Sequence, residues 1–284
     1  MTAQAAAVSA GDIRDRLRRP LRIAAVALPV VLVLLAVLPF DAYGTDLSSR
    51  FGGPSAEHLL GTDQLGRDVF ARLAVGARVS VGFTVLALLL CAVLGTALGT
   101  AAAWGGRLVG QVFQRVVDVL VAVPAVLVGL VAIAATPDGG PGLGVLLLAI
   151  VSVGWLPFAR LAYQLVLREK GREYVEGAVA VGAGQVRIVC VHVLPNLARP
   201  LLAHLCLRFA NILLTVAGLS FLGLGPQPPT PEWGAMIAEG RQYMFAAPQL
   251  VLVPSVAVVG TALLVVLLGR DLERRALTGP SGQV

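Results

Sequence analysis

The chain reads REYVEGAVAVGAGQVRIVCVHVLP at residues 172–195, a charged stretch between two strongly apolar segments. Apolar side chains recur at roughly helical spacing before Gly182, and they do so again from Val186 to Leu194. Because glycines interrupt the pattern at 182 and 184, the stretch predicts two short helices joined by a tight turn outside the bilayer. A helix pair with one polar and one apolar face is suited to docking against another protein.

The spacing within this stretch is similar to that of a known loop. In this chain the residues with that spacing are Glu176, Ala178, Gly182 and, after nine further residues, His192-Val193-Leu194-Pro195. The pattern resembles the EAA loop of permeases in ATP-driven (ABC) importers. The residues around His192 resemble the C-type subunit of the dipeptide, oligopeptide and nickel branch. The resemblance implies an all-α, type I ABC importer permease fold, in which this loop is a cytoplasmic coupling helix seated in a groove of a separate ATPase.

Two residues depart from the pattern of the family. Gly177 replaces an alanine, which costs a helix ~1 kcal/mol. Gly184 stands where serine is expected to cap the second helix, a change of about a few tenths of a kcal/mol. Neither change removes the match. The alternative interpretation is an ordinary cytoplasmic loop with helical content.

Composition places the chain in a membrane. Of its 284 residues, 57% are hydrophobic and 13% are charged, which is too apolar for a soluble domain of this length. The net charge of +6 would also fit nucleic-acid binding, but the basic residues are distributed as membrane topology requires. Cys91, Cys190 and Cys206 show neither metal-ligand spacing nor a paired framework, so we interpret them as small apolar residues.

Runs without charged residues predict an all-α integral membrane protein with six transmembrane helices. Their approximate cores are residues 22–40, 81–103, 117–136, 142–163, 200–222 and 248–268. A cleaved signal peptide is the alternative for the first run, but no small-x-small cleavage site follows Phe40. The expected organisation is an N-terminal tail at 1–21, the first span, an outer loop at 41–80, a permease core at 81–268 and a C-terminal tail at 269–284.

The arginine and lysine residues orient these spans. With the N-terminus inside, the inner segments carry 16 basic residues and the outer segments carry five. The positive-inside rule therefore predicts that both termini lie in the cytoplasm, together with residues 172–195. Arg208 lies early in the fifth span, where it either extends toward the cytoplasmic interface or contacts the solute.

Three features within the spans bear on packing. The Gly95-x-x-x-Gly99 motif allows close helix contact, within the chain or with a partner subunit. Asp118 lies near the inner end of the third span, and Arg115 is its expected ion-pair partner. Pro124 can kink the third span, either for packing or for gating.

The outer loop contains a second motif. Residues 61–68 read GTDQLGRD and residues 76–80 read GARVS, and both resemble the sequence before the second span of C-type subunits. Thr62 and Asp63 form turns and are candidate helix caps, while residues 69–77 predict an amphipathic helix on the outer surface. The loop is either a structural collar on the translocation path or a contact for a substrate-binding protein. The candidate contact residues are Asp63, Arg67 and Asp68.

A third motif lies between the last two spans. Residues 219–236 read LSFLGLGPQPPTPEWGAM and also resemble the peptide-permease subfamily. The prolines exclude a helix and stiffen the backbone, while Trp233, Tyr243 and Phe245 suit a membrane interface. We expect a rigid elbow that forms an external gate or a docking face, with Pro228 and Trp233 as its site residues. A simple connector is the alternative.

No catalytic, metal-binding or cofactor-binding residue is expected in this chain. The only lysine, Lys170, does not stand in a Gly-x-x-x-x-Gly-Lys-Ser/Thr motif, so ATP and Mg²⁺ must be bound by partner ATPase subunits. His58, His192 and His204 lack the spacing of zinc ligands.

The sequence therefore predicts a multi-pass permease subunit in the cytoplasmic membrane of a bacterium. The resemblance implies import of di- or oligopeptides, with a homologous sister permease, two ATPase subunits or domains and an extracytoplasmic solute-binding protein as partners. No nucleic-acid partner is expected. One alternative is the import of nickel or another small solute by the same mechanism. Others are an ion-coupled secondary transporter, which would need ionisable residues near the midplane, and a non-transporting scaffold, which would not need the loop at 172–195.

Overall fold

The computed structural model describes residues 39–135 and 142–278, and this part of the chain contains helices and no strand. The predicted first span, 22–40, lies outside the described residues except for its last two positions. The main helices are α2 (Val69–Trp104), α3 (Gly106–Val121), α4 (Ala125–Ala134), α5 (Leu143–Gly154), α6 (Leu156–Lys170), α7 (Glu173–Ala180), α8 (Gln185–Arg187), α9 (Leu194–Phe221), α10 (Trp233–Gly240) and α11 (Gln249–Thr278). Shorter helical segments are η1 (Leu47–Ser49), the π-helical η2 (Ile188–Val193) and η3 (Arg241–Tyr243).

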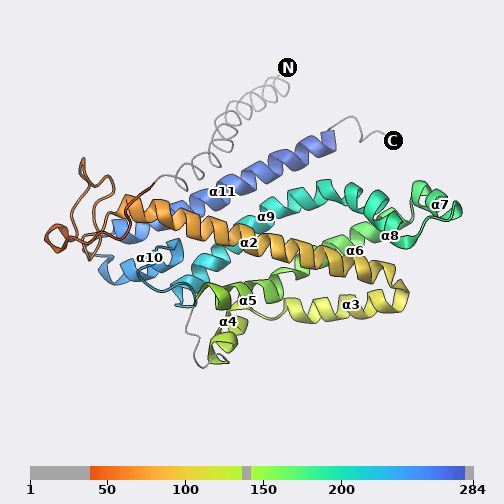
Figure 1. The fold of residues 1–284 in the computed structure, drawn as a ribbon, viewed down its shortest axis with the longest axis horizontal. Helices are drawn as coiled ribbons and strands as arrows, with labels where there is room; N and C mark the ends of the chain where they lie inside the picture. Colours follow the sequence, from red (N-terminus) through yellow and green to blue (C-terminus); the bar gives the residue numbers. More distant parts are fainter. Residues whose placement is uncertain (1–38, 136–141, 279–284) are drawn as a thin grey trace, which may run out of the picture.

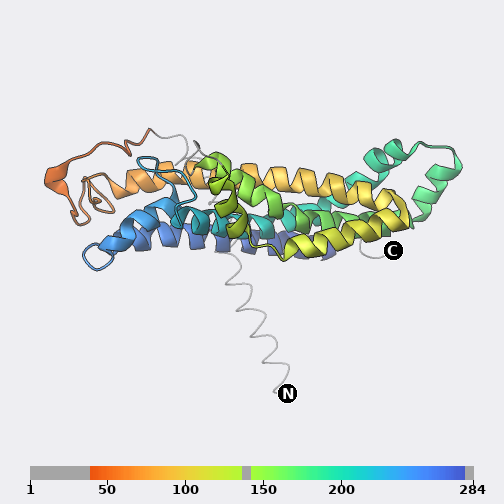
Figure 2. The same ribbon diagram turned by 90° about the horizontal axis from the view of Figure 1, so that it is seen from below.

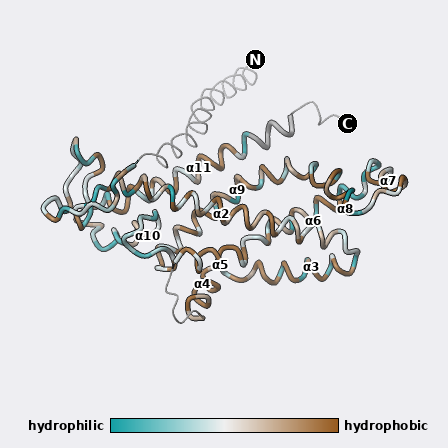
Figure 3. The backbone as a smooth tube through the Cα atoms, viewed as in Figure 1, coloured by the Kyte–Doolittle hydropathy of each residue, from teal (hydrophilic) through white to brown (hydrophobic). Residues whose placement is uncertain are grey.

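The helices form an elongated bundle, along whose axis α2, α9 and α11 run (Figures 1 and 2). The loops around η1 and α10 lie toward one end, and α7 and α8 lie at the other (Figure 1). Apolar residues dominate the middle of the bundle, whereas hydrophilic residues gather at its ends (Figure 3). This is the distribution expected of a bundle that crosses a membrane.

Among the described residues, four helical segments are long and apolar enough to span a bilayer. They are α2, the α5–α6 pair over Leu143–Lys170, the Pro200–Phe221 part of α9 and the Gln249–Asp271 part of α11. Helices α3 and α4 supply a fifth candidate if this bent pair crosses as one span. These segments correspond to the predicted second to sixth spans, and the predicted count of six also requires the first.

Helix α2 unites the predicted outer helix at 69–77 and the predicted span at 81–103 in one helix of 36 residues. It begins where the Asp68 carboxylate accepts a hydrogen bond from the Ala71 amide at 2.7 Å. No proline separates the two parts, so the helix continues without a break. At 1.5 Å per residue it is about 54 Å long and extends beyond a hydrocarbon core of about 30 Å.

Residues 104–116, which lie between the predicted second and third spans, are mostly helical in the structure. Gly106 has a φ of +89°, a conformation that favours glycine, and it lets the chain reverse so that α3 begins at once. Helix α3 ends at Val121, and α4 follows Pro124 at an angle of 79°. Proline has no N–H with which to continue a helix, so the predicted bend at Pro124 is confirmed.

Close contact between α2 and α6 holds the centre of the bundle. Gly95 and Gly99 face the backbone of α6, and a Cβ atom on Gly95 would lie 2.7 Å from the Cβ of Phe158. The glycine motif therefore packs within the chain. The main buried cluster surrounds this contact, and its members include Ala87, Cys91, Leu146, Phe158 and Leu213.

The ion pair of Asp118 differs from the prediction. Within the described residues its carboxylate pairs with the Arg160 guanidinium of α6 rather than with Arg115. The pair depends on the packing of α3 against α6, where Tyr163 lies close to Gly110. Local spacing along α3 could not reveal a partner that is contributed by another helix.

Candidate functional site

Residues 172–195, called the inner loop below after their predicted cytoplasmic side, form the predicted helix-turn-helix at one end of the bundle (Figures 1 and 2). Helix α7 ends in a turn where Gly182 has a φ of +79° and donates its N–H to the Val179 carbonyl at 2.9 Å. This left-handed backbone conformation favours glycine. Gly184 occupies the N-cap of α8, the capping position expected for it.

The second helix of the inner loop does not end at Pro195. Helix α8 passes through η2, which contains His192, into α9, so Leu194 and Pro195 lie in the first turn of α9. Proline fits there because a first-turn residue needs no intrahelical N–H bond. The inner loop is thus joined to α9 without an intervening coil.

The tip of the inner loop exposes apolar side chains. Val181 is 85% exposed, Val186 77% and Val179 59%. Glu176, in the first turn of α7, is also exposed. An apolar surface bordered by charge marks a site of interaction with another protein.

The other side of the inner loop is anchored to the bundle by a small apolar core. Its buried members are Ala103, Val166, Val175, Ile188, Val193 and Leu197, and Ala178 and Leu194 pack against them. These residues come from α2, α6, α7, η2 and α9. Ala178 and Leu194 therefore attach the loop to the spans, whereas Glu176 faces away from the core.

A polar brace formed by Glu169, Tyr174, His192 and Asn196 fixes α7 between α6 and α9. The Tyr174 hydroxyl donates to Glu169 Oε2 at 2.6 Å and accepts from Asn196 Nδ2 at 3.0 Å. Asn196 also donates to the His192 carbonyl at 2.8 Å. Burial, followed by the hydrogen bond to Glu169, raises the pKa of the Tyr174 hydroxyl, so the donor stays protonated. No sequence signal points to the brace, because Tyr174 and Asn196 are 22 residues apart.

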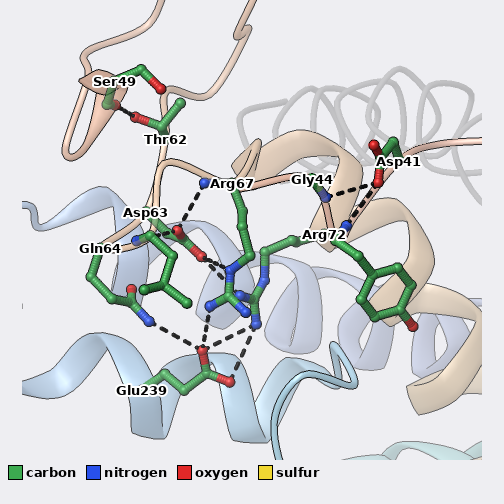
Figure 4. A network of polar contacts seen from close by, with 11 residues as sticks. Asp41, Gly44, Ser49, Thr62, Asp63, Gln64, Arg67, Arg72 and Glu239 are labelled. Atoms are coloured by element: carbon green, nitrogen blue, oxygen red, sulfur yellow. Dashed lines mark hydrogen bonds and ion pairs between the residues drawn. The ribbon is translucent and has the colours of Figure 1, made fainter. Parts of the chain in front are cut away.

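At the opposite end of the bundle, polar and charged side chains form a compact group, called the outer polar cluster after its predicted side of the membrane (Figure 4). Its members are Asp63, Gln64, Arg67, Arg72 and Glu239. Arg67 Nε and Arg72 Nη1 donate to Asp63 Oδ2 at 2.7 and 2.8 Å. The Nη2 atoms of the two arginines lie 3.0 and 3.1 Å from Glu239 Oε2. Gln64 Nε2 donates to the same oxygen at 3.3 Å. The two guanidinium groups thus lie between two carboxylates.

The outer polar cluster is largely buried, with the Glu239 side chain 17% exposed. Asp63, Arg67 and Arg72 are 4%, 3% and 2% exposed. Asp63 Oδ1 also accepts from the amides of Leu65 and Arg67 at 2.8 and 3.0 Å, which fixes the turn before α2. Burial raises the pKa of Glu239, and Arg67 acts in the opposite direction. Asp63 and Arg67, two of the predicted contacts for a binding protein, are therefore satisfied within the chain, as a structural collar requires.

Asp68 and Thr62 hold the outer loop and the start of α2. Asp68, a predicted contact residue, caps α2, and its Oδ2 lies 2.8 Å from His58 Nδ1. Thr62 was a candidate cap, but it holds the loop instead: it donates to the Ser49 carbonyl and accepts from the Gly52 amide at 2.8 Å. The helix starts too late in the sequence for Thr62 or Asp63 to cap it.

The elbow between α9 and α10 buries the tryptophan that was expected at a membrane interface. Trp233 is 2% exposed, and its Nε1 donates to the Leu73 carbonyl at 3.0 Å. Glu232 caps α10 through Ala235 and accepts from the Ser80 hydroxyl at 2.9 Å. The elbow is thereby fixed to α2, whereas Pro228 remains exposed. The sequence did not indicate Arg72 or Glu239 as site residues. They are 167 positions apart in the chain, and a contact at that separation leaves no local pattern.

The sequence of this chain matches a known protein family and several named transport proteins. Residues 95–277 match the family described as "Binding-protein-dependent transport system inner membrane component". A putative peptide transport system permease protein of Brucella suis biovar 1 (strain 1330) is 39% identical over 262 residues, which cover 90% of this chain and 86% of the relative. The dipeptide transport system permease protein DppC of Alkalihalophilus pseudofirmus is 36% identical, covering 86% of this chain and 78% of the relative.

A nickel permease and a solved structure are also similar. The nickel transport system permease protein NikC of Escherichia coli (strain K12) is 37% identical, covering 80% of this chain and 84% of the relative. A chain of the MetNI methionine ABC transporter in an inward-facing conformation matches with a TM-score of 0.59 at 17% identity, covering 74% of this chain and 98% of that chain. The structural match shows a shared fold. With the family match and relatives above 30% identity, this chain belongs to the family of inner membrane components of binding-protein-dependent transport systems.

Proposed function

We propose that this chain is the permease subunit of an ATP-driven, binding-protein-dependent importer, with six membrane spans and both termini in the cytoplasm. The observation that carries the proposal is the inner loop. It presents an exposed apolar tip on a helix-turn-helix and continues without a coil into a membrane span. A membrane protein needs such a surface when the energy for its movement comes from another subunit.

The orientation is supported by the two ends of the bundle. The inner loop and the outer polar cluster lie at opposite ends of the long axis (Figure 1). The predicted inner segments carry 16 basic residues against five in the outer segments. The positive-inside rule then puts the inner loop in the cytoplasm, where ATP is available.

In the proposed mechanism, each of two permeases receives one ATPase subunit or domain on its inner loop. Glu176 and the turn at Gly182 contact the ATPase, and ATP-driven closure of the ATPases displaces α7. The displacement reaches α2 and α6 through the apolar core around Val175 and Ile188. It reaches α9 through Tyr174, Asn196 and the helical connection at His192, Leu194 and Pro195.

At the outer end, the proposed role of the polar cluster is that of a collar. It joins the start of α2 to α10 and keeps that end of the chain rigid while the inner end moves. Pro228 and the region of Asp68 remain accessible, so they are the proposed contacts for the solute-binding protein or an external gate.

The proposed cargo is a di- or oligopeptide, delivered by an extracytoplasmic binding protein and passed between this chain and a homologous sister permease in a bacterial plasma membrane. Relatives named as peptide and dipeptide permeases support this choice. Nickel is a second candidate, because a nickel permease is 37% identical to this chain.

Reconstitution tests the proposal. The complex of this permease, its sister, the ATPases and the binding protein is placed in proteoliposomes, and uptake of radiolabelled dialanine is measured. We expect uptake to require ATP and to persist when a protonophore collapses the proton gradient. Uptake that survives removal of ATP but stops with the protonophore would show an ion-coupled transporter instead. A parallel measurement with nickel in place of dialanine separates the two candidate cargoes.

A further inference from the structure

A positive charge lies deep inside the bundle on α9. One turn before Arg208 on α9, the ring of His204 lies 5.0 Å from the ring of Phe158, which packs against Gly95 of α2. Trp104 marks the inner end of α2, where the Lys170 ammonium lies 4.7 Å from the centroid of its ring. Nine residues separate Gly95 from Trp104, about 14 Å along the helix, and Arg208 lies one turn farther from that end. This distance exceeds the length of an arginine side chain, so Arg208 does not reach the cytoplasmic interface.

This charge has no partner among the residues that the structure describes. Arg208 Nε is buried without a hydrogen bond, and no described carboxylate pairs with the guanidinium. One turn earlier, His204 Nε2 is also buried without a partner, and its ring lies 5.0 Å from the ring of Phe158. An ionised group at membrane depth faces a bundle interior or an aqueous path and pairs with a group that it finds there.

Arg208 belongs to a polar face of α9. His204, Arg208, Asn211 and Thr215 follow at intervals of four, three and four residues, so they share one face of the helix. Asn211 is exposed, and its amide bonds only within its own helix, to the Leu207 carbonyl at 3.3 Å. The exposed large side chains along the spans of α2 and α11 are apolar by contrast, among them Leu86, Leu89, Val93, Leu252, Val256, Val259 and Leu263.

The contrast shows which helix faces lipid. Leucine and valine on the exposed faces of α2 and α11 suit contact with acyl chains or with another apolar surface. An arginine next to an amide and a hydroxyl does not suit lipid, because these groups lose their hydrogen bonds to water there. The polar face of α9 is therefore suited to border an aqueous path in the proposed permease assembly.

We propose that Arg208 binds a carboxylate of the transported solute near the middle of the membrane, and that for a peptide this group is the C-terminal carboxylate. The inference rests on the proposed function and names a chemical feature of the cargo. A guanidinium presents two parallel N–H donors that match a carboxylate. Asn211 and Thr215, farther toward the outer end on the same face, supply neutral hydrogen-bonding groups for the peptide part of the solute.

Single substitutions with two probes test the proposal in the reconstituted complex. The probes are dialanine and its C-terminal amide, which lacks the carboxylate. Uptake by each variant is divided by wild-type uptake of the same probe, so that selection by the binding protein cancels. Arg208→Gln removes an unpaired charge from the membrane, so we expect the complex to assemble normally, as co-purification of the ATPases will verify.

We expect Arg208→Gln to lower dialanine uptake about tenfold, the loss of one charge-assisted hydrogen-bond pair, and to change uptake of the amide less than about twofold. Arg208→Lys should retain more dialanine uptake than Arg208→Gln, because lysine keeps the positive charge but lacks the two parallel N–H donors of the guanidinium. Arg107→Gln, at an exposed arginine at the start of α3, is the matched control and should leave uptake of both probes unchanged.

Equal losses for the two probes would show that Arg208 pairs with the sister permease, and no loss for dialanine would show that it contacts no cargo. Either result overturns the proposal.

A charge-rescue measurement gives an independent readout that does not depend on the amide. In a background without the native cysteines, Arg208→Cys is treated with a positively charged or a neutral methanethiosulfonate reagent. We expect the positive reagent to restore dialanine uptake and the neutral one to leave it low. Failure of the positive reagent to restore uptake would contradict the proposal. Absence of ATP-dependent uptake by the wild-type complex would instead contradict the proposed function.

Discussion

The two ends of this molecule handle their polar and apolar groups in opposite ways. At the outer end, two arginines and two carboxylates are buried together, and each charge has an opposite charge within hydrogen-bond distance. At the inner end, valines at the tip of the inner loop are exposed while the residues beneath them are packed. The charges of the outer polar cluster are paired within the chain, whereas the tip of the inner loop leaves apolar side chains exposed.

This difference separates residues that hold the fold from residues that act on partners. Replacement of a residue in the outer polar cluster should destabilise the protein, because it leaves a buried charge without compensation. Replacement at the inner tip should leave the protein folded and interrupt its coupling. The predictions below test this division, beginning with the largest effect.

The largest effect is expected for Arg72→Met in the outer polar cluster. Arg72 bridges Asp63 and Glu239, and its removal from a site that is 2% exposed should lower the free energy of unfolding by about 3–5 kcal/mol. The thermal stability of the detergent-solubilised complex measures this effect. Arg50→Met, at an exposed arginine of the same loop, is the control and should change stability by less than about 0.5 kcal/mol. An Arg72→Met complex as stable as wild type would remove the distinction between the two ends.

At the inner tip, Glu176→Lys and Gly182→Asp should abolish uptake while the protein still inserts at normal levels. The first reverses a charge on the docking surface. The second adds a side chain at a φ of +79°, with backbone strain of about 1–2 kcal/mol, which the fold can tolerate. Gly177→Ala is the matched control, because no atom lies within 4 Å of the added Cβ and alanine favours the helix. Wild-type uptake in both loop variants would contradict the docking role.

A smaller effect is expected for the polar brace. Tyr174→Phe removes the hydroxyl that links Glu169 to Asn196, at a cost of about 1 kcal/mol. We expect uptake to fall about threefold while ATP hydrolysis by the complex continues, since the ATPase still docks but moves α9 less. A parallel fall in uptake and hydrolysis would mean that Tyr174 supports docking rather than transmission.

The smallest effect is expected for Asp118→Asn. The Asp118 and Arg160 side chains are 51% and 42% exposed in the chain, and exposed ion pairs contribute about 0–1 kcal/mol. Uptake should therefore fall by less than about fivefold, and it should remain insensitive to a protonophore. A complete loss of uptake would assign Asp118 a direct role in transport.

The sequence contained enough information for the helices and their order, because charge-free runs and glycine turns are local features. The turn at Gly182, the bend at Pro124 and the packing role of Gly95 could be predicted on this basis. The length of α2 could not, since the charged residues near position 78 suggested a boundary that the helix crosses.

The contacts of the candidate sites were less accessible to sequence reasoning. Asp63 and Arg67 were predicted as contacts for a binding protein, but the sequence did not indicate that Arg67 pairs with Glu239, which follows far later in the chain. Trp233 was expected at a membrane interface, but in the structure it packs against α2 and donates to the Leu73 carbonyl. In each case a tertiary contact decided whether a polar or aromatic side chain was exposed or buried.

The most direct test of the account measures whether the tip of the inner loop is covered by the ATPase. In a cysteine-free background, Val181→Cys is treated with a maleimide in the purified permease pair and again after the ATPase subunits are added. The account predicts rapid labelling of the permease pair and strong protection in the full complex, while a control cysteine at the exposed Ser48 reacts equally in both. Equal labelling of Val181→Cys with and without the ATPases would contradict it.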